Sequence, residues 1–426
     1  MTKSNKLTTF IIIAMVAGIA AGEIIRSSYN GDADAVKGVA DGFSMISMVF
    51  LRLIQMIIAP LVFSTLVVGI AKLGDLKTVG RVGGKALLWF FSASLVSLFL
   101  GMILVNLFQP GSTMDLPLPE AGAATGIEKA GMTIKGFLEH MFPKSVIDAM
   151  AHNEILAIVV FSLVFGTAAA AIGEKAKPVI SLLDSVAHIM LKMTSFIMNL
   201  APVAVFAAMT AVIASKGLGV LQTYGIFMSE FYFGLLMLWI VLLTAAWFLV
   251  GKRVLTLLSR IKEPILLAFS TSSSEAALPK TMEELERFGC KDKIVGFVLP
   301  LGYSFNLDGS MMYMTFASIF IAQSYGIDLP IGTQITMLLV LMLTSKGIAG
   351  VPRASLVVIA ATLSSFDIPE EGLLLLLGID SLLDMGRSAT NVVGNAVATV
   401  AVSKWENSLE HDHSENHTHK THTSDH

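Results

Sequence analysis

The chain has 426 residues, of which 54% are hydrophobic and only 14% carry charge. Soluble domains contain about 25% charged residues, so this composition excludes an ordinary soluble protein and indicates a membrane protein. The net charge of −3 gives no basis for a nucleic-acid partner, and the single cysteine, Cys290, excludes an internal disulfide and a multi-cysteine metal site.

Eight apolar stretches are long enough to cross a bilayer, which requires about 20 apolar residues in a helix. The predicted spans cover residues 8–25, 42–71, 86–108, 154–173, 178–214, 224–250, 294–324 and 372–403. Two further apolar stretches, 263–279 and 331–366, are interrupted by small and polar residues. We therefore expect an all-α membrane protein.

Lysines and arginines between the spans predict how the chain is oriented. They cluster before the first span, at Lys3 and Lys6, and after the second, fourth and sixth spans. The positive-inside rule then puts both termini in the cytoplasm, with the protein in the cell inner membrane. Eight spans agree with this only if each interrupted stretch enters and leaves on one side, so we expect two re-entrant hairpins. Non-helical backbone at such depth requires surrounding protein or a water-filled cavity.

The last predicted span carries polar residues that are costly in a membrane. Asp380, Asp384, Arg387, Asn391 and Asn395 follow one another at helical spacing and share one stripe of the helix. Each charge at the bilayer centre costs about 2.5–3.5 kcal/mol. One explanation is a buried Asp–Arg pair that holds helices together. The other is a solute site, in which Arg387 binds a substrate carboxylate with both arms and Asp384 binds an ammonium group.

The seventh predicted span contains the sequence Asn306-Leu307-Asp308-Gly309-Ser310. Its polar residues are spaced by two, which does not match one face of a regular helix. We predict an unwound segment whose carbonyls and side chains converge on a cation. The alternative is a glycine-kinked helix in which Asp308 pairs with another span.

The two interrupted stretches have polar tips at residues 270–279 and 345–355. A serine run alone is most often a flexible loop. Because each tip interrupts an apolar segment, we favour hairpin tips whose backbone N–H groups and half-helix N-termini face an anion. Two hairpins, each followed by a polar-interrupted span, also look like an internal repeat, which is typical of transporters with a site at the midplane.

Together these motifs resemble the dicarboxylate/amino acid:cation symporter family, which includes the glutamate transporters. The resemblance rests on the serine-rich tip with Leu278-Pro279, on residues 306–310, on residues 350–352 and on residues 384–395. It covers nearly the whole chain up to about residue 406, and the four motifs in this order are highly specific.

The resemblance implies eight transmembrane helices and two re-entrant helical hairpins in a lipid-embedded homotrimer that works as an elevator. Residues 1–80 and 109–215 would form the scaffold, with helices one and two in the first segment and an extracellular loop and helices four and five in the second. Residues 81–108 (helix three) and 224–406 (helices six to eight with both hairpins) would form the mobile transport domain. Residues 407–426 would be a disordered, histidine-rich cytoplasmic tail, in which the histidines either stay solvated or bind a metal or sense pH.

Carried over by motif, the family's substrate contacts would come from both hairpins and the last two spans. These residues are Ser272, Ser274, Ser310, Val351, Ser355, Asp384, Arg387, Ser388 and Asn391. The resemblance gives Arg387 the side-chain carboxylate and Asp384 the amino group of the substrate. We therefore expect a secondary active symporter for glutamate or aspartate, with a C4-dicarboxylate symporter (succinate, fumarate or malate) as the alternative.

The family's cation ligands correspond to Gly302, Ser304, Asn306, Asp308, Ser345, Ile348, Asn391 and Asn395. Sodium-coupled members have an aspartate at the position of Asn395, and Tyr and Thr where this chain has Phe90 and Ala93. A neutral amide weakens a site for a hard cation, so we favour a co-transported proton, with sodium as the alternative, and we expect no bound cofactor.

A proton carrier must be a titratable group in the site, and burial can raise a carboxyl pKa towards neutrality. Glu275 at the first hairpin tip is the candidate, followed by Asp308. Alternatively, Glu275 only stabilises the N-terminus of the hairpin's second helix. Other classes are an ion or anion channel, which also uses intramembrane carboxylates, and an intramembrane enzyme. We expect no enzyme, because no nucleophile–base constellation accompanies the carboxylates.

Overall fold

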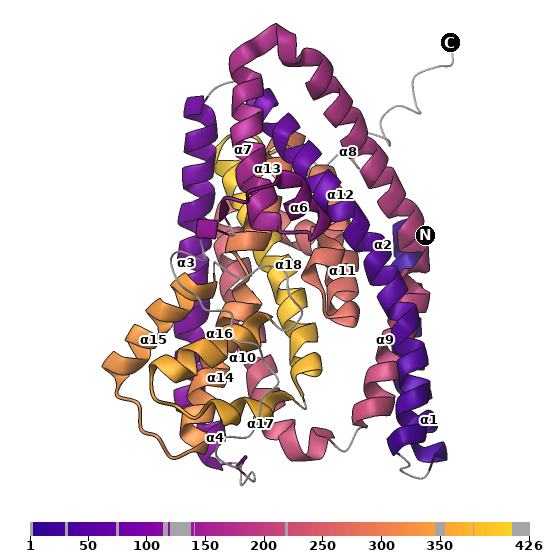
Figure 1. Cartoon of the computed structure of the whole chain (residues 1–426), viewed down its shortest axis with the longest axis vertical. Coiled ribbons are helices and arrows are strands. Elements are labelled where there is room, and N and C mark those ends of the chain that lie inside the picture. Colours follow the sequence, from indigo (N-terminus) through magenta and orange to yellow (C-terminus); the bar gives the residue numbers. More distant parts are fainter. Residues whose placement is uncertain are drawn as a thin grey trace.

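The computed structural model describes residues 3–29, 33–73, 76–113, 118–119, 138–139, 141–217, 220–345, 354–377 and 379–410. Nearly all residues in these ranges are helical, and the only extended pairing among them is an isolated bridge between Cys290 and Leu409. The predicted all-α fold is confirmed (Figure 1).

Most helices follow one another through short connections. In chain order they are α1 (Lys3–Ser28), α2 (Ala33–Leu73), α3 (Leu76–Phe108), α4 (Pro110–Thr113), α6 (Val146–Ala151), α7 (Ile155–Ile172), η1 (Gly173–Ala176), α8 (Lys177–Ile197), η2 (Met198–Leu200), α9 (Ala201–Lys216), α10 (Val220–Val250), α11 (Arg253–Thr271), α12 (Ser274–Phe288), α13 (Asp292–Phe305), α14 (Asp308–Ser324), α15 (Ile331–Thr344), α16 (Ala354–Ser365), η4 (Glu370–Leu373), α17 (Leu374–Leu377) and α18 (Asp380–Trp405).

Several helical segments in the described ranges are long and apolar enough to cross a membrane. They are Thr9–Ser28, Ala35–Ala71, Lys77–Thr113, Ile155–Ser215 and Tyr224–Val250. Large apolar side chains on these segments point outwards, as Phe248 does with 84% of its surface exposed. Such a surface is unfavourable in water and suits contact with lipid.

The last two predicted spans are interrupted rather than continuous. In residues 294–324, α13 ends at Phe305 and α14 begins at Asp308, and Asn306 and Leu307 between them have ψ values of 64° and 66°. The predicted unwinding is confirmed. The prediction of one span over residues 372–403 is wrong at its start, because η4 and α17 precede a separate helix, α18. The leucines of α17 are as hydrophobic as those of a membrane span, so the prediction included them, although they belong to a different helix.

The first interrupted stretch forms a helical hairpin of α11 and α12, as predicted. The chain reverses at Ser272, which is left-handed with φ 50°. The side chain of Ser273 then accepts a hydrogen bond from the backbone N–H of Ala276 at 3.3 Å and caps α12. The serine run is therefore a tight turn rather than an irregular loop. The second hairpin has limbs α15 and α16, and its tip, residues 346–353, lies outside the described residues.

The helices pack in two groups. The N-terminal bundle consists of α1, α2, α7, α8 and α9, which pack mainly on one another. The central bundle consists of α3 and the helices from α10 to α18, and α18 runs through its middle in contact with α3, α10, α11, α12, α13 and α14 (Figure 1). Contacts between the bundles are made largely by α11, α12 and α13. A cavity at this boundary is lined by residues of α2, α8, α12 and α13, including Asp292 and Lys293 at the start of α13.

Candidate functional site

The tip of the first hairpin reaches the start of α18. Ser272 Oγ donates a hydrogen bond to the carbonyl oxygen of Ser381 at 3.3 Å. Ser274 is the first residue of α12, whose N-terminal backbone N–H groups favour negative charge. The hairpin thus brings two of the predicted substrate residues to the beginning of the polar stripe.

Arg387 is the centre of the polar stripe and is almost completely buried, with 1% of its side chain exposed. Its Nη2 lies 3.0 Å from Asp380 Oδ1 and 2.9 Å from Asp384 Oδ1, and its Nε donates to Asp384 Oδ1 at 3.1 Å. Asp380 is buried, whereas Asp384 is 31% exposed. Two carboxylates around one guanidinium leave an excess negative charge beside Asp384.

The ring of Tyr313 on α14 completes the surroundings of Arg387. The guanidinium carbon of Arg387 lies 4.0 Å from the centre of that ring, a cation–π contact. The Tyr313 hydroxyl donates to Asp380 Oδ1 at 3.1 Å, so the same aromatic side chain orients both members of the ion pair.

One nitrogen of Arg387 has no partner within the part of the chain that the structure describes. Nη1 is buried and makes no hydrogen bond, although Nε and Nη2 are both satisfied. A buried N–H group without a partner costs about 1–3 kcal/mol, and more when it is charged. Arg387 thus keeps one buried nitrogen that no hydrogen-bond partner among the described residues satisfies.

Asn391, one turn further along α18, holds the start of α14. Its Oδ1 accepts from the backbone N–H of Gly309 at 2.9 Å and of Ser310 at 3.4 Å, and its Nδ2 donates to Ser310 Oγ at 3.3 Å. Two predicted substrate residues, Asn391 and Ser310, therefore bind each other. In this state Asn391 acts as a cap for α14.

The remaining predicted site residues are serines on α18, α16 and α13 and directly after α15, and two residues at the tip of the second hairpin. Ser388 is buried on α18, and Ser355 is buried in the first turn of α16. Ser345 follows α15 and donates to the Met342 carbonyl oxygen at 3.0 Å. Ser304 lies on α13 next to Gly302. Two residues, Ile348 and Val351, lie outside the described residues.

Two buried amide side chains, Asn306 and Asn395, lie where the break between α13 and α14 meets α18, and we call their surroundings the amide pocket. Asn306 Nδ2 donates to Asp308 Oδ2 at 3.0 Å, whereas Asn306 Oδ1 is buried without a partner among the described residues. The same holds for both side-chain polar atoms of Asn395. Gly302 is required by this close approach, since a Cβ there would lie 2.2 Å from Asn395 Oδ1. Asn306 lies beside them, since its backbone N–H donates to the Gly302 carbonyl oxygen at 2.7 Å and its Nδ2 would lie 3.4 Å from a Cβ at Gly394. Three of the predicted cation residues, Gly302, Asn306 and Asn395, are therefore neighbours.

Glu275 lies in the first turn of α12 and is partly exposed. A carboxylate there stabilises the helix N-terminus, in agreement with the alternative role. Its place at the hairpin tip, close to Ser272 and Ser274, is equally compatible with proton binding.

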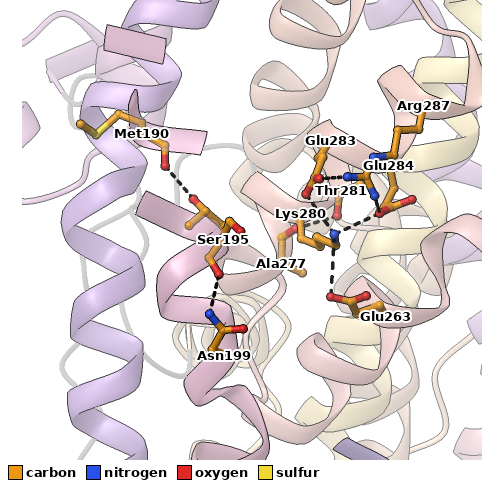
Figure 2. Close-up of polar contacts among 11 residues, drawn as sticks. Met190, Ser195, Asn199, Glu263, Ala277, Lys280, Thr281, Glu283, Glu284 and Arg287 are labelled. Atoms are coloured by element: carbon orange, nitrogen blue, oxygen red, sulfur yellow. Dashed lines mark hydrogen bonds and ion pairs between the residues drawn. The ribbon is translucent and has the colours of Figure 1, made fainter. Parts of the chain in front are cut away.

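Buried charges connect the two limbs of the first hairpin further down (Figure 2). Lys280 on α12, only 12% exposed, lies 3.0 Å from Glu284, 2.9 Å from Glu283 and 3.9 Å from Glu263 on α11. Arg287 pairs with Glu283 and Glu284. We call these five residues the hairpin brace.

The segment after α18 is fastened to the base of the same hairpin. Lys291 N donates to the Ser408 carbonyl at 3.2 Å, and Glu410 N donates to the Gly289 carbonyl at 2.8 Å. Arg253, at the start of α11, donates to the carbonyl oxygens of Phe288 and Glu410, both at 2.8 Å. We call residues 406–410 the C-terminal strap.

Glu406 in the strap also binds the start of α3. Arg81 donates to it at 2.9 Å and Lys85 at 2.6 Å, and only 7% of the Glu406 side chain is exposed. The hydrogen bond from Arg81, helped by Lys85, lowers the pKa of Glu406 below its ordinary value.

Sequence reasoning missed two kinds of residue at this site. Asp380 lay on the predicted stripe but was given no role in the site, although it binds Arg387. Tyr313, Tyr232 and Trp239 had no signal, because aromatic residues in apolar helices are usually core. Tyr232 Oη donates to the Leu382 carbonyl at 2.6 Å, and Trp239 Nε1 donates to Thr390 Oγ1 at 2.9 Å.

Comparison with known proteins agrees with this geometry. Residues 7–405 match the model of the sodium:dicarboxylate symporter family. A protein of Laribacter hongkongensis called C4-dicarboxylate transport protein is 42% identical over 408 residues, covering 94% of this chain and 90% of the relative. The Bacillus subtilis protein of the same name is 39% identical, covering 95% of both chains. The proton/sodium-glutamate symport protein of Geobacillus stearothermophilus is 41% identical, covering 93% of both.

The match to the family model spans nearly the whole chain and includes every element around Arg387. The names of the family and of these relatives are those of transporters, and they include both substrate types considered above. The chain belongs to the sodium:dicarboxylate symporter family.

Proposed function

We propose that the protein is a secondary active symporter that takes up glutamate or aspartate together with a proton. The observation that carries this proposal is the buried guanidinium of Arg387, whose Nη1 has no partner among the described residues. A substrate carboxylate completes the hydrogen bonding of that nitrogen. Asp384 is the more exposed of the two carboxylates, and the ammonium group of an amino acid compensates the excess negative charge there.

The transport step is an elevator movement of the central bundle along the N-terminal bundle in a homotrimer. The division into two bundles supports this proposal, as does the cavity at their boundary. The apolar exposed surface supports insertion in the cell inner membrane, and the positive-inside rule supports cytoplasmic termini.

Proton coupling is supported by the chemistry of residues near the site. Asn395 is a neutral amide at a position where a carboxylate would suit a hard cation better. Glu275, at the tip of the first hairpin, is the titratable group that we propose as the carrier. Protonation of Glu275 on loading and deprotonation on release would couple substrate movement to the pH gradient.

A C4-dicarboxylate such as succinate is the second candidate substrate. Asp384 already pairs with Arg387 at 2.9 Å, which weakens its attraction for an ammonium group. Two of the relatives described above are also named for C4-dicarboxylate transport. In this alternative both substrate carboxylates bind through Arg387 and the backbone N–H groups of the hairpin tips.

Reconstituted uptake tests the proposal. Purified protein in liposomes is given labelled glutamate with a proton gradient or a sodium gradient imposed separately, and unlabelled aspartate or succinate as competitor. We expect accumulation above equilibrium with the proton gradient and competition by aspartate. Competition by succinate alone supports the second candidate. Sodium-driven accumulation contradicts proton coupling, and flux that never exceeds equilibrium indicates a channel.

A further inference from the structure

The amide pocket contains three buried polar atoms without partners among the described residues: Asn306 Oδ1, Asn395 Oδ1 and Asn395 Nδ2. Asn306 is 0% and Asn395 1% exposed. The large majority of buried side-chain polar atoms in proteins are hydrogen-bonded, to protein or to ordered water. Three unpartnered atoms at one helix crossing therefore indicate a ligand.

The orientation of the Asn306 amide is fixed by its neighbour. Its other end lies 3.0 Å from Asp308 Oδ2, and a carboxylate accepts but does not donate hydrogen bonds when ionised. Asn306 must therefore turn its NH2 group to Asp308, which leaves its oxygen as the end without a partner among the described residues. The ligand has to donate a hydrogen bond or be positively charged at this point.

Asn395 adds a second requirement that does not depend on how its amide is turned. Both its oxygen and its nitrogen lack partners, so in either orientation it presents one acceptor oxygen and one NH2 donor group. A ligand that satisfies this side chain must both accept and donate hydrogen bonds.

We infer that the amide pocket binds a water molecule instead of an alkali cation. Water donates to Asn306 Oδ1 and to the amide oxygen of Asn395, and it accepts from the NH2 group of Asn395. These three hydrogen bonds match the number that buried waters usually make. Of these three atoms an alkali cation satisfies only the two oxygens, since such cations prefer oxygen ligands, and it faces the partial positive charge of the NH2 group.

The walls of the pocket agree with a small neutral ligand. Because Gly302 has no Cβ, the Asn395 side chain can lie directly against it. The edge of the Phe90 ring lies 3.5 Å from the position that a Cβ of residue 302 would take. Aromatic carbon on that side offers no further oxygen to a cation. The amide side chain at position 395 thus decides which species the pocket accepts.

A pocket that holds water instead of sodium fits the proposed proton coupling, and the inference rests on the proposed function in this respect alone. Its test is sodium binding by the full-length protein in detergent, without any substrate. Thermal unfolding is measured in sodium chloride and in choline chloride at equal ionic strength. The variants are Asn395→Asp, which replaces the NH2 group by a charged oxygen, and Asn106→Asp as the matched control. Asn106 pairs with Gln334, outside the pocket.

We expect no sodium-specific shift for the wild type or for Asn106→Asp, and a rise of about 2 °C or more for Asn395→Asp. A sodium-specific rise in the wild type, or its absence in folded Asn395→Asp, overturns the inference. If Asn395→Asp does not fold, wild-type crystals soaked in a thallium salt decide: no anomalous peak is expected in the pocket, and a peak there overturns the inference. None of these experiments measures uptake, so their outcome can be told apart from a failure of the proposed transport function.

Discussion

Asp384 differs from Asp380 in that it binds Arg387 while remaining partly open to solvent. The two carboxylates therefore differ in whether a ligand can reach them. Asp380 is held by Tyr313 and Arg387 inside the protein. We propose that Asp384 exchanges part of its interaction with Arg387 for a contact with a bound amino group.

The substitution Asp384→Asn tests this difference. Removing the charge eliminates a charged hydrogen bond to an ammonium group, which is worth about 1.5–3 kcal/mol, or roughly 10–100-fold in affinity. We expect glutamate uptake to fall by that factor relative to succinate uptake in proteoliposomes. Asp328→Asn, an exposed change far along the chain, is the control and leaves the ratio unchanged. An unchanged ratio in Asp384→Asn contradicts a role in binding the amino group.

Glu406 gives a pH-dependent contribution to stability. Its pKa is lowered in the folded protein, mainly by the hydrogen bond from Arg81. A lowered pKa means that the contribution is complete above the unfolded value of about 4.3 and is lost as the pH falls through the folded value. Glu406→Gln should thus lower the unfolding temperature by a constant amount from pH 7 to pH 5, with the gap closing below about pH 4.

The matched control for Glu406→Gln is Glu174→Gln. Glu174 pairs with Lys177, and both side chains are largely exposed, so the pair contributes little to stability. Thermal unfolding of this variant should follow the wild type from pH 3 to pH 7. A gap for Glu406→Gln that persists unchanged below pH 4 would show that ionisation of Glu406 does not matter.

Among the elements, the first hairpin is unusual in containing a buried charge network between its limbs. The hairpin brace joins α11 to α12 less than three turns from the tip that carries Ser272 and Ser274. A brace in this position keeps the tip in register with α18. The hairpin is thereby expected to move as one unit.

Lys280→Met removes the cation that Glu263 and Glu284 share. Breaking a buried ion pair by removing one partner costs about 3–5 kcal/mol, because the other charge is left uncompensated. We expect a loss of stability of that size in chemical unfolding, whereas Arg287→Met, at a partly exposed partner, costs less. The double variant Lys280→Met/Glu284→Gln should recover part of the loss. If Lys280→Met is as stable as the wild type, the brace is not needed.

Sequence reasoning predicted the elements whose signal is local. The break at Asn306 and Leu307 followed from polar residues at a spacing that no helix face accommodates, and the first hairpin from polar residues that divide an apolar run. The start of α18 at Asp380 was missed because the leucines before it have the same hydropathy as a helix. The aromatic contacts of Tyr313 and Trp239 depend on which helices cross, and no single-sequence pattern contains that information.

At the scale of the whole molecule, the strap closes the central bundle at its end by joining α3, the base of the first hairpin and α18. Residues 411–426 lie beyond the strap and outside the described residues. We predict that this tail is dispensable for transport, and the strap marks the boundary of the dispensable part.

Two truncations test that boundary. A chain ending at Glu410 keeps the strap and should transport at the wild-type rate. A chain ending at Trp405 loses Glu406 and the pairing with Gly289 and Lys291, so it should unfold several degrees lower and accumulate less in the membrane. Uptake and thermal unfolding of both proteins provide the measurement. Equal stability of the two truncations would contradict a structural role of the strap.

The pairing of Leu409 with Cys290 also sets the order of events during synthesis. The base of the hairpin leaves the ribosome more than a hundred residues before its partner does. Until residues 408–410 have been synthesised, the backbone groups of Gly289 and Lys291 lack their hydrogen-bond partners. Translation must therefore pass residue 410 before this part of the bundle can close, and nascent chains that stop earlier present an open hairpin base to the quality-control proteases of the cell.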